Sequence, residues 1–153
     1  MNNSIANLLK SVYALMKNNK AITWVIGFQI FRLALLPFMG LMPQDAYYYL
    51  YGQNLSLSYF DHPGMIGYLL RFFTDLLGTS VFVVKFADFV VTSMTLLSFY
   101  KLASYFLSRE KRQRAMVLMA STIFISIVSF NSTPDVPLLF FWSLSLICLY
   151  KAI

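Results

Sequence analysis

The sequence predicts an all-α fold, a polytopic bundle of about four transmembrane helices with further helices in its outer loops. Hydrophobic residues make up 59% of the 153 residues and charged residues only 12%, whereas soluble domains are about 45–50% apolar and about 25% charged. In lipid, the backbone satisfies its own hydrogen bonds only in helices or closed barrels. The apolar runs here are long and continuous rather than alternating, which favours helices.

The basic residues form two clusters within a chain whose net charge is +6. One cluster, Lys10, Lys17 and Lys20, precedes the first apolar run, and the other lies in the segment SREKRQR at 108–114. This positive-inside pattern predicts a cytoplasmic N-terminus and argues against nucleic acid as a partner. The first apolar run is too long for a signal peptide and no A-x-A site follows it, so an uncleaved anchor is expected.

Residues 1–20 are expected to form a cytoplasmic surface segment, either a short amphipathic helix over 4–17 or a frayed tail. A first span is predicted over 21–42, since about 20 residues cross the hydrocarbon core. Arg32 lies near its middle, with Gln29 one turn earlier on the same face. A charge at this depth is costly, so both are expected to face the bundle interior, in an ion pair with another helix or at an anionic lipid.

The polar, tyrosine-rich segment 43–80 is predicted to be an outer catalytic loop with two interfacial helices, over 46–55 and from Pro63 to Gly78. Proline suits a first helical turn, and tyrosine is favoured at the membrane interface. In the second helix, Arg71 and Asp75 are spaced for an i,i+4 ion pair.

Three further spans are predicted over 81–107, 115–130 and 136–153. Lys85 and Asp88, one turn apart near the outer end of the second span, are expected to neutralise each other. Counting spans from a cytoplasmic N-terminus places Asp45, Asp61 and Asp135 on the same outer side of the membrane.

The segment PQDAYYYLYGQNLSLSYFDHPG, residues 43–64, holds two acids and the only histidine of the chain. The polar residues on the outer side each have a structural interpretation: Asp45 as a helix cap, Asp135 as a turn residue and His62 as an idle surface residue. These residues are, however, expected on the same side of the membrane and near aromatic rings such as that of Tyr47. Such a surface suits a sugar or isoprenoid ligand.

The chemistry that fits these residues is transfer from a lipid phosphate donor, with a carboxylate as general base. The sequence has no phosphate-binding glycine loop and no CxxC, HExxH or GxSxG motif. Charge developing on the leaving phosphate calls for cations, and His62, Arg71 and Lys85 are available. Asp61 is a candidate ligand for a divalent metal ion, the one cofactor considered.

The run DAYYYLYGQNLSLSYFDHPG resembles the first outer loop of membrane glycosyltransferases of the GT-C class. It is most similar to bacterial relatives of the dolichyl-phosphate-mannose protein mannosyltransferases and of the aminoarabinose transferases that modify lipid A. Those proteins carry a D-E-A-Y-Y-W-like start, then Y-[FY]-D-H-P-P, and later a T-P-D-A-P-L-L-F-F-W-like segment. The last is matched here by TPDVPLLFFW, from Thr133 to Trp142.

The resemblance implies roles for the matching positions. Asp45 corresponds to the catalytic base and Asp135 to an acid that assists it. Asp61 and His62 correspond to an element near the metal and the lipid phosphate, and Lys85 falls where relatives often carry a phosphate-contacting arginine. Two positions depart from the pattern: Gln44 stands where the family has its first acid, and Gly64 replaces the second proline.

The expected function is therefore transfer of a sugar from a polyprenyl-phosphate-linked donor to a lipid, glycan or protein acceptor. The reaction is expected at the outer face of a bacterial inner membrane, with the donor and membrane lipids as partners. Residues 1–153 are expected to be the N-terminal part of a longer transferase domain and inactive alone. The alternatives are an inert anchor and a lipid or polysaccharide transporter subunit, whose pathway Arg32, Lys85 and Asp88 would line.

Overall fold

A computed structural model describes residues 19–153 and shows an all-helical chain, which confirms the predicted fold class. The predicted surface helix over 4–17 lies outside the described residues. The elements are α2 (Lys20–Leu35), the short 3-10 turn η1 (Leu36–Phe38), α3 (Pro43–Gln53), α4 (Met65–Leu77), α5 (Val81–Ala103), α6 (Arg109–Ala120), α7 (Ile123–Val128) and α8 (Asp135–Ala152).

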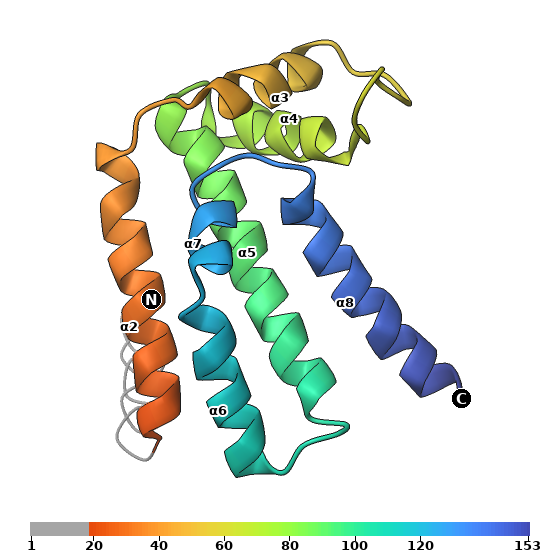
Figure 1. The fold of residues 1–153 in the computed structure, drawn as a ribbon. Helices are drawn as coiled ribbons and strands as arrows, with labels where there is room; N and C mark the ends of the chain where they lie inside the picture. Colours follow the sequence, from red (N-terminus) through yellow and green to blue (C-terminus); the bar gives the residue numbers. More distant parts are fainter. Residues whose placement is uncertain (1–18) are drawn as a thin grey trace, which may run out of the picture.

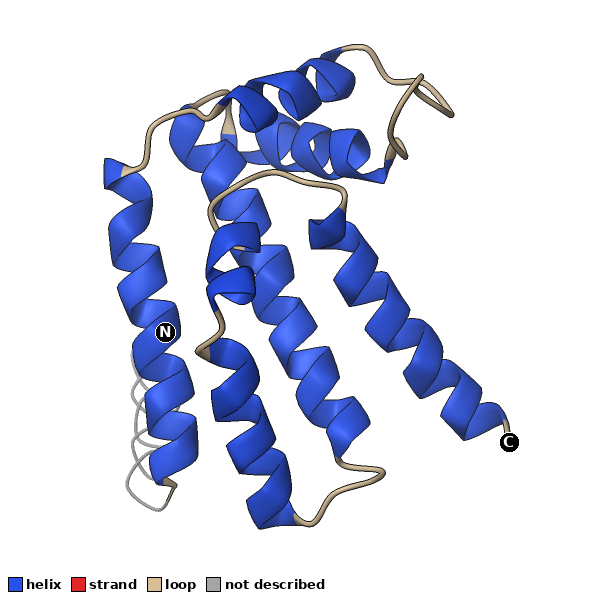
Figure 2. Cartoon of the chain, in the orientation of Figure 1, coloured by secondary structure: helices blue, strands red, loops and turns tan. Residues whose placement is uncertain are grey.

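The long helices run side by side, and two shorter helices lie across one end of them (Figure 1). Helices α2, α5, α6 with α7, and α8 form the bundle, while α3 and α4 form what we call the platform. Irregular segments are confined to the two ends of the bundle and to the short break between α6 and α7 (Figure 2). The loop between α5 and α6 and the C-terminus lie at the end opposite the platform.

Three helices in the described part of the chain are long and apolar enough to cross a membrane. They are Lys20–Phe38, Val81–Ala103 and Asp135–Ala152, with mean hydropathies of 1.6, 1.7 and 1.4. The predicted span over 115–130 is instead divided into α6 and α7, because the helix is interrupted at Ser121 and Thr122. Thr122 begins the second piece as its N-cap, where its hydroxyl accepts a 3.2 Å bond from the amide of Ile125.

Arg32 of the neighbouring helix α2 forms hydrogen bonds with both parts of the divided segment, α6 and α7. Its guanidinium donates to the carbonyl of Ala120 at 2.5 Å and to the hydroxyl of Ser126 at 2.9 Å. A third bond of 2.6 Å reaches the amide oxygen of Gln29. The prediction that Arg32 and Gln29 face the interior is confirmed, but the guanidinium satisfies neutral acceptors exposed by the break and not a carboxylate.

The two platform helices approach each other closely at Gly52 and Gly67. A Cβ atom added to Gly67 would lie 2.9 Å from the Cβ of Tyr51, and one added to Gly52 would lie 3.0 Å from the carbonyl oxygen of Gly67. Only glycine permits backbones this close. Ile66 and Leu70 of α4 are fully buried beneath this contact, so the platform is anchored by an apolar face.

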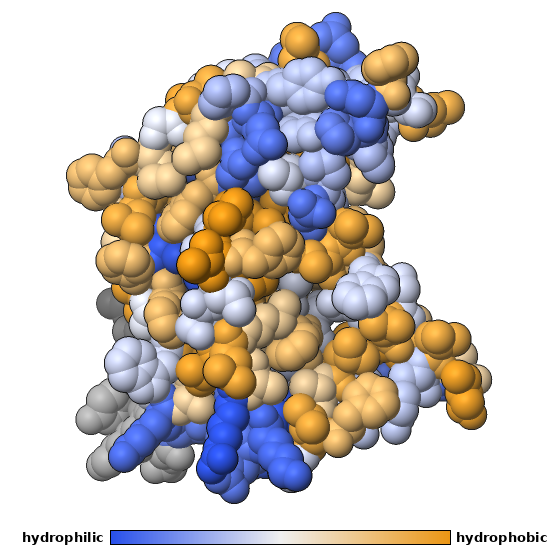
Figure 3. Space-filling view, viewed as in Figure 1, coloured by the Kyte–Doolittle hydropathy of each residue, from blue (hydrophilic) through white to orange (hydrophobic). Residues whose placement is uncertain are grey.

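The surface has hydrophilic side chains at both ends of the molecule and hydrophobic ones between them (Figure 3). A hydrophilic cluster at the foot of α6 carries the SREKRQR side chains, and an apolar band lies between it and the polar platform. This distribution is typical of a bundle that crosses a bilayer. The acidic loops and the basic loop lie at opposite ends, as the sequence predicts.

We expect Arg32→Leu to lower the free energy of unfolding by about 1–3 kcal/mol, because the Ala120 carbonyl would lose its charged donor. Unfolding in mixed detergent and SDS micelles measures the change. Arg114→Leu is the control, since it removes a charge of the same type from an exposed i,i+4 pair with Glu110 and should cost about 0.5 kcal/mol or less. Equal shifts for the two variants would contradict the role assigned to Arg32.

Candidate functional site

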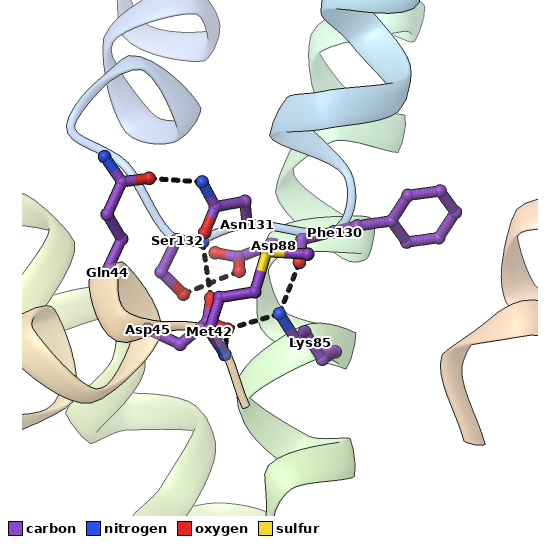
Figure 4. Close-up of polar contacts among 8 residues, drawn as sticks. All are labelled: Met42, Gln44, Asp45, Lys85, Asp88, Phe130, Asn131 and Ser132. Carbon is purple, nitrogen blue, oxygen red and sulfur yellow. Dashed lines mark hydrogen bonds and ion pairs between the residues drawn. The ribbon is translucent and has the colours of Figure 1, made fainter. Parts of the chain in front are cut away.

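A buried ion pair between Asp45 and Lys85 joins the platform to the bundle. Both side chains are completely inaccessible to solvent. The ammonium group of Lys85 donates to one oxygen of Asp45 and, at 2.5 Å, to the carbonyl oxygen of Phe130 (Figure 4). The pair therefore ties α3, α5 and the loop after α7 to one another.

The local sequence explains the position of Asp45. Pro43 starts α3, and Met42 before it is extended. Asp45, at the third helical position, accepts a 2.7 Å bond from the backbone amide of Met42, as carboxylates do in a capping box. Its other oxygen accepts a 2.8 Å bond from the amide of Ser132. Three donors thus surround a carboxylate that has no exposed surface.

Asp88 lies one turn below Lys85 and is also fully buried. One of its oxygens accepts a 2.6 Å bond from the hydroxyl of Ser132, and the other has no partner within the described residues. The predicted pairing of Lys85 with Asp88 is therefore wrong: the partner of Lys85 is Asp45, forty positions away in sequence. Both carboxylates are fully buried, but two backbone amides hold that of Asp45 in place, whereas that of Asp88 accepts one bond, from Ser132.

A second, exposed cluster lies on the outer surface of the platform, around Asp61. The hydroxyls of Tyr47 and Tyr51 each donate to one oxygen of its carboxylate, that of Tyr47 at 2.7 Å. These bonds, with the one from Tyr51 the stronger influence, hold the pKa of Asp61 below its usual value. The imidazole of His62 lies 3.7 Å from the same carboxylate, and its ring lies 5.5 Å from that of Tyr48.

Asp135 is exposed at the first turn of α8 and makes no hydrogen bond or ion pair within the described residues. Its charge nevertheless reaches the platform. Burial raises the pKa of the Tyr48 phenol, and the negative charges of Asp61 and, more weakly, Asp135 raise it further. Tyr48 therefore lies within electrostatic range of both exposed carboxylates, one from each outer loop.

Gln44, where the resembled family has its first acid, is exposed and bonded to the second outer loop. The side-chain amide of Asn131 donates to its side-chain oxygen (Figure 4). Position 44 therefore faces the outer surface and position 45 faces the interior. The neutral residue stands at the accessible position and the acid at the inaccessible one.

The structure divides the predicted site residues into two groups. Tyr47, Asp61, His62 and Asp135 lie on the surface of the platform end, whereas Asp45 and Lys85 lie beneath it. Arg71 belongs to neither group, because its guanidinium pairs with Asp75 at 2.7 Å on the surface of α4, as the spacing predicts. The catalytic role of Asp45 stays a prediction, and its geometry disfavours it, since a fully buried carboxylate engaged by three donors is not accessible to an acceptor hydroxyl.

The residues present do not assemble a metal site. The described part of the chain has no group of three or more histidine, cysteine or acidic side chains placed to hold an ion. Asp61, the predicted ligand, has both oxygens engaged by tyrosine hydroxyls, and its nearest potential co-ligand is His62 alone.

Sequence reasoning missed three members of these networks: Tyr51, Asn131 and Ser132. Tyr51 had a usable signal, because Tyr47 and Tyr51 are four residues apart and so share a helix face. The loop residues had none, since their partners are more than 40 positions away in sequence.

Comparisons with known proteins agree with the sequence motifs. The family described as dolichyl-phosphate-mannose-protein mannosyltransferase matches residues 61–153. Among curated proteins, the lipid A galacturonosyltransferase RgtD of Rhizobium johnstonii is 28% identical over 131 residues, which cover 82% of this chain and 27% of that protein. The chain thus spans about a quarter of the length of this curated relative. No solved structure matches the chain significantly.

Breaking the buried pair should be costly. We expect Asp45→Asn or Lys85→Met to lower the free energy of unfolding by about 3–5 kcal/mol each, because each leaves one uncompensated buried charge or donor. The double variant should cost less than the sum of the two. Asp75→Asn, which breaks the exposed pair with Arg71, is the control and should cost about 0.5 kcal/mol or less. Additive losses in SDS-induced unfolding would contradict direct pairing.

Removing the Tyr51 hydroxyl should raise the pKa of Asp61 toward its ordinary value. A carboxylate with a lowered folded-state pKa stabilises the fold above its unfolded pKa, and this contribution disappears as the pH falls through the folded value. Tyr51→Phe should therefore move the titration of Asp61 to higher pH, as measured by carboxyl ¹³C NMR. Tyr68→Phe is the control, because that hydroxyl donates to the Ser56 carbonyl instead. An unchanged titration in Tyr51→Phe would show that the phenol does not act on Asp61.

Proposed function

Because the chain belongs to the dolichyl-phosphate-mannose-protein mannosyltransferase family, we propose that the protein transfers a sugar from a polyprenyl-phosphate-linked donor to an acceptor at the platform end of the membrane. One observation carries this proposal beyond family membership. Two carboxylates, Asp61 and Asp135, come from loops far apart in sequence, lie exposed at the platform end together with His62, and both act electrostatically on the buried Tyr48. Acid, base and aromatic surface are the groups that sugar transfer needs.

Asp135 is the carboxylate best suited to act as general base. It is exposed and free of hydrogen bonds within the described residues, so its lone pairs are available to an acceptor hydroxyl. Its site at the start of α8 is fixed by a helix that packs against α5. The acceptor proton would pass to Asp135 as the hydroxyl oxygen attacks the anomeric carbon and the lipid phosphate leaves.

His62 is the cation placed to receive the donor phosphate. It is partly exposed on the platform surface, with its imidazole 3.7 Å from the Asp61 carboxylate. Tyr47 and Tyr51 fix Asp61 through their hydroxyls, so they position His62 indirectly. Lys85 is not available for this task, because its ammonium group is engaged by Asp45 and Phe130 in the interior.

Asp45 has a positioning role in this proposal. By accepting from the amide of Ser132 it fixes the loop that leads into α8, and so the position of Asp135. The resemblance assigns the base to Asp45 itself, so the two carboxylates are competing candidates. They differ in one measurable respect: loss of Asp45 should reduce stability and activity together, and loss of Asp135 should reduce activity alone.

The curated relative indicates which substrates to test first. Its name describes a galacturonosyltransferase that acts on lipid A. A glycolipid acceptor and a uronic acid donor are therefore the first pair to assay for this protein. The platform lies across one end of the candidate spans, the level at which a lipid-linked donor and a lipid-anchored acceptor would present their polar groups.

The alternative, a transporter subunit, receives no support from the intramembrane polar residues. A transport pathway needs such groups at several depths and open to the substrate. Arg32, Lys85 and Asp88 do lie at several depths, but all three are buried and bonded to protein groups.

We expect Asp135→Asn to lower the rate of sugar transfer by about 10²–10⁴-fold, because the proton acceptor is lost. Transfer is measured in membranes containing the native protein, supplied with polyprenyl-phosphate sugars and lipid A. Asp75→Asn is the control and should retain full activity, since Asp75 is exposed and paired only with Arg71. Full activity in Asp135→Asn, with loss in a stable Asp45→Asn protein, would move the base to Asp45.

A further inference from the structure

A continuous apolar groove runs along most of α2 and reaches the end of the bundle opposite the platform. It consists of two adjoining cavities of about 250 and 290 Å³ between α2, α5 and α6. The two share four lining residues, Val25, Ile26, Leu97 and Met116. On α2 the lining extends from Ala21 to Leu33, a length of about 18 Å at 1.5 Å per residue. That length is close to the roughly 15 Å that one leaflet contributes to the hydrocarbon core.

The groove ends beside a cluster of basic residues. Tyr100 and Gln113 line its final part, and Arg112, next in sequence to Gln113, stacks on the ring of Tyr100 with its guanidinium carbon 4.4 Å from the ring centroid. The basic residues at this end are Lys20, Lys101, Arg109, Lys111, Arg112 and Arg114. The one acidic residue of the 108–114 segment, Glu110, is already paired with Arg114.

Among the described basic residues of this cluster, Arg112 is the one with a buried donor that lacks an acceptor. Its Nε atom is buried without an acceptor, and the guanidinium makes no hydrogen bond or ion pair within the described residues. A guanidinium has five N–H donors in a planar fork that matches a phosphate. A buried donor left without an acceptor is costly, so an anion at this position would remove the cost.

We propose that this groove is a binding site for one anionic phospholipid, with an acyl chain in the groove and the headgroup phosphate at Arg112. The apolar lining accounts for the chain, and the positive end accounts for the headgroup. The site is separate from the donor and acceptor surface, because the basic end and the platform lie at opposite ends of the bundle (Figure 1). The proposal is therefore independent of the sugar-transfer function.

Native mass spectrometry of the native protein, released from nanodiscs of equal phosphatidylglycerol and phosphatidylcholine, tests the proposal. We expect phosphatidylglycerol to be retained in about five-fold preference, the contribution typical of one basic residue near an anionic headgroup. Arg112→Gln should abolish the preference. Arg114→Gln is the matched control, because it removes the same charge from the same helix and should leave the preference intact.

Two further arms separate the contributions of chain and headgroup. Ile26→Trp fills the groove and should reduce retention of phosphatidylglycerol, while added inorganic phosphate should not displace the lipid. Equal retention of the two lipids by the unmodified protein would overturn the proposal, and so would an equal effect of Arg112→Gln and Arg114→Gln. Displacement by inorganic phosphate would show an anion site without a lipid. Thermal unfolding of each variant verifies that the fold is intact, and Arg112, on a partly exposed surface, is not needed for it.

Discussion

The buried ion pair of Asp45 and Lys85 is the interaction on which the platform end of this protein depends. Taking two charges out of water costs several kcal/mol per ion, and attraction offsets this only where further hydrogen bonds complete the site. Here those bonds come from the backbone of three segments, through the amides of Met42 and Ser132 and the carbonyl of Phe130. The electrostatic requirement of one pair thereby fixes the relative positions of both outer loops.

That constraint determines which acids reach the surface. Because Asp45 must face inward to meet Lys85, its neighbour Gln44 faces outward and meets Asn131. The accessible carboxylates next to the outer loops are those of Asp61, held by tyrosine hydroxyls, and Asp135, at the start of a helix. Buried charge and accessible charge are thus separated by depth at the platform end.

Much of the fold was predictable because apolar runs of about 20 residues have few options in lipid. The helices at 20–38, 81–103 and 135–152 follow from run length alone. The interruption at Ser121 and Thr122 was not predictable, because its stabilising donor, Arg32, lies 88 positions away from Ala120. The hydrophobic pattern of a segment indicates whether that segment can form a helix by itself. It does not show an interruption whose free carbonyl is hydrogen-bonded by a residue of another helix.

The sequence predicted at which end of the bundle the site residues lie, but it did not predict which buried side chains form ion pairs. Span counting placed Asp61 and Asp135 at one end, and both lie there. Spacing suggested that Lys85 would pair with Asp88, since residues one turn apart are neighbours on a helix surface. In a buried setting, however, hydrogen-bond completeness outweighs proximity along a helix, and the carboxylate with more donors around it lies on another helix.

The bonds from Arg32 to the divided segment also have a consequence for biosynthesis. The helix that carries Arg32 leaves the ribosome first, and the carbonyl that receives its guanidinium follows 88 residues later. At synthesis rates of about 5–20 residues per second, this delay is about 4–18 s. For that interval a charge that costs about 2.5–3.5 kcal/mol at mid-membrane has Gln29 of its own helix as an acceptor but lacks those at Ala120 and Ser126. Stable integration of α2 is therefore a delayed event, completed only when the segment containing α6 and α7 enters beside it.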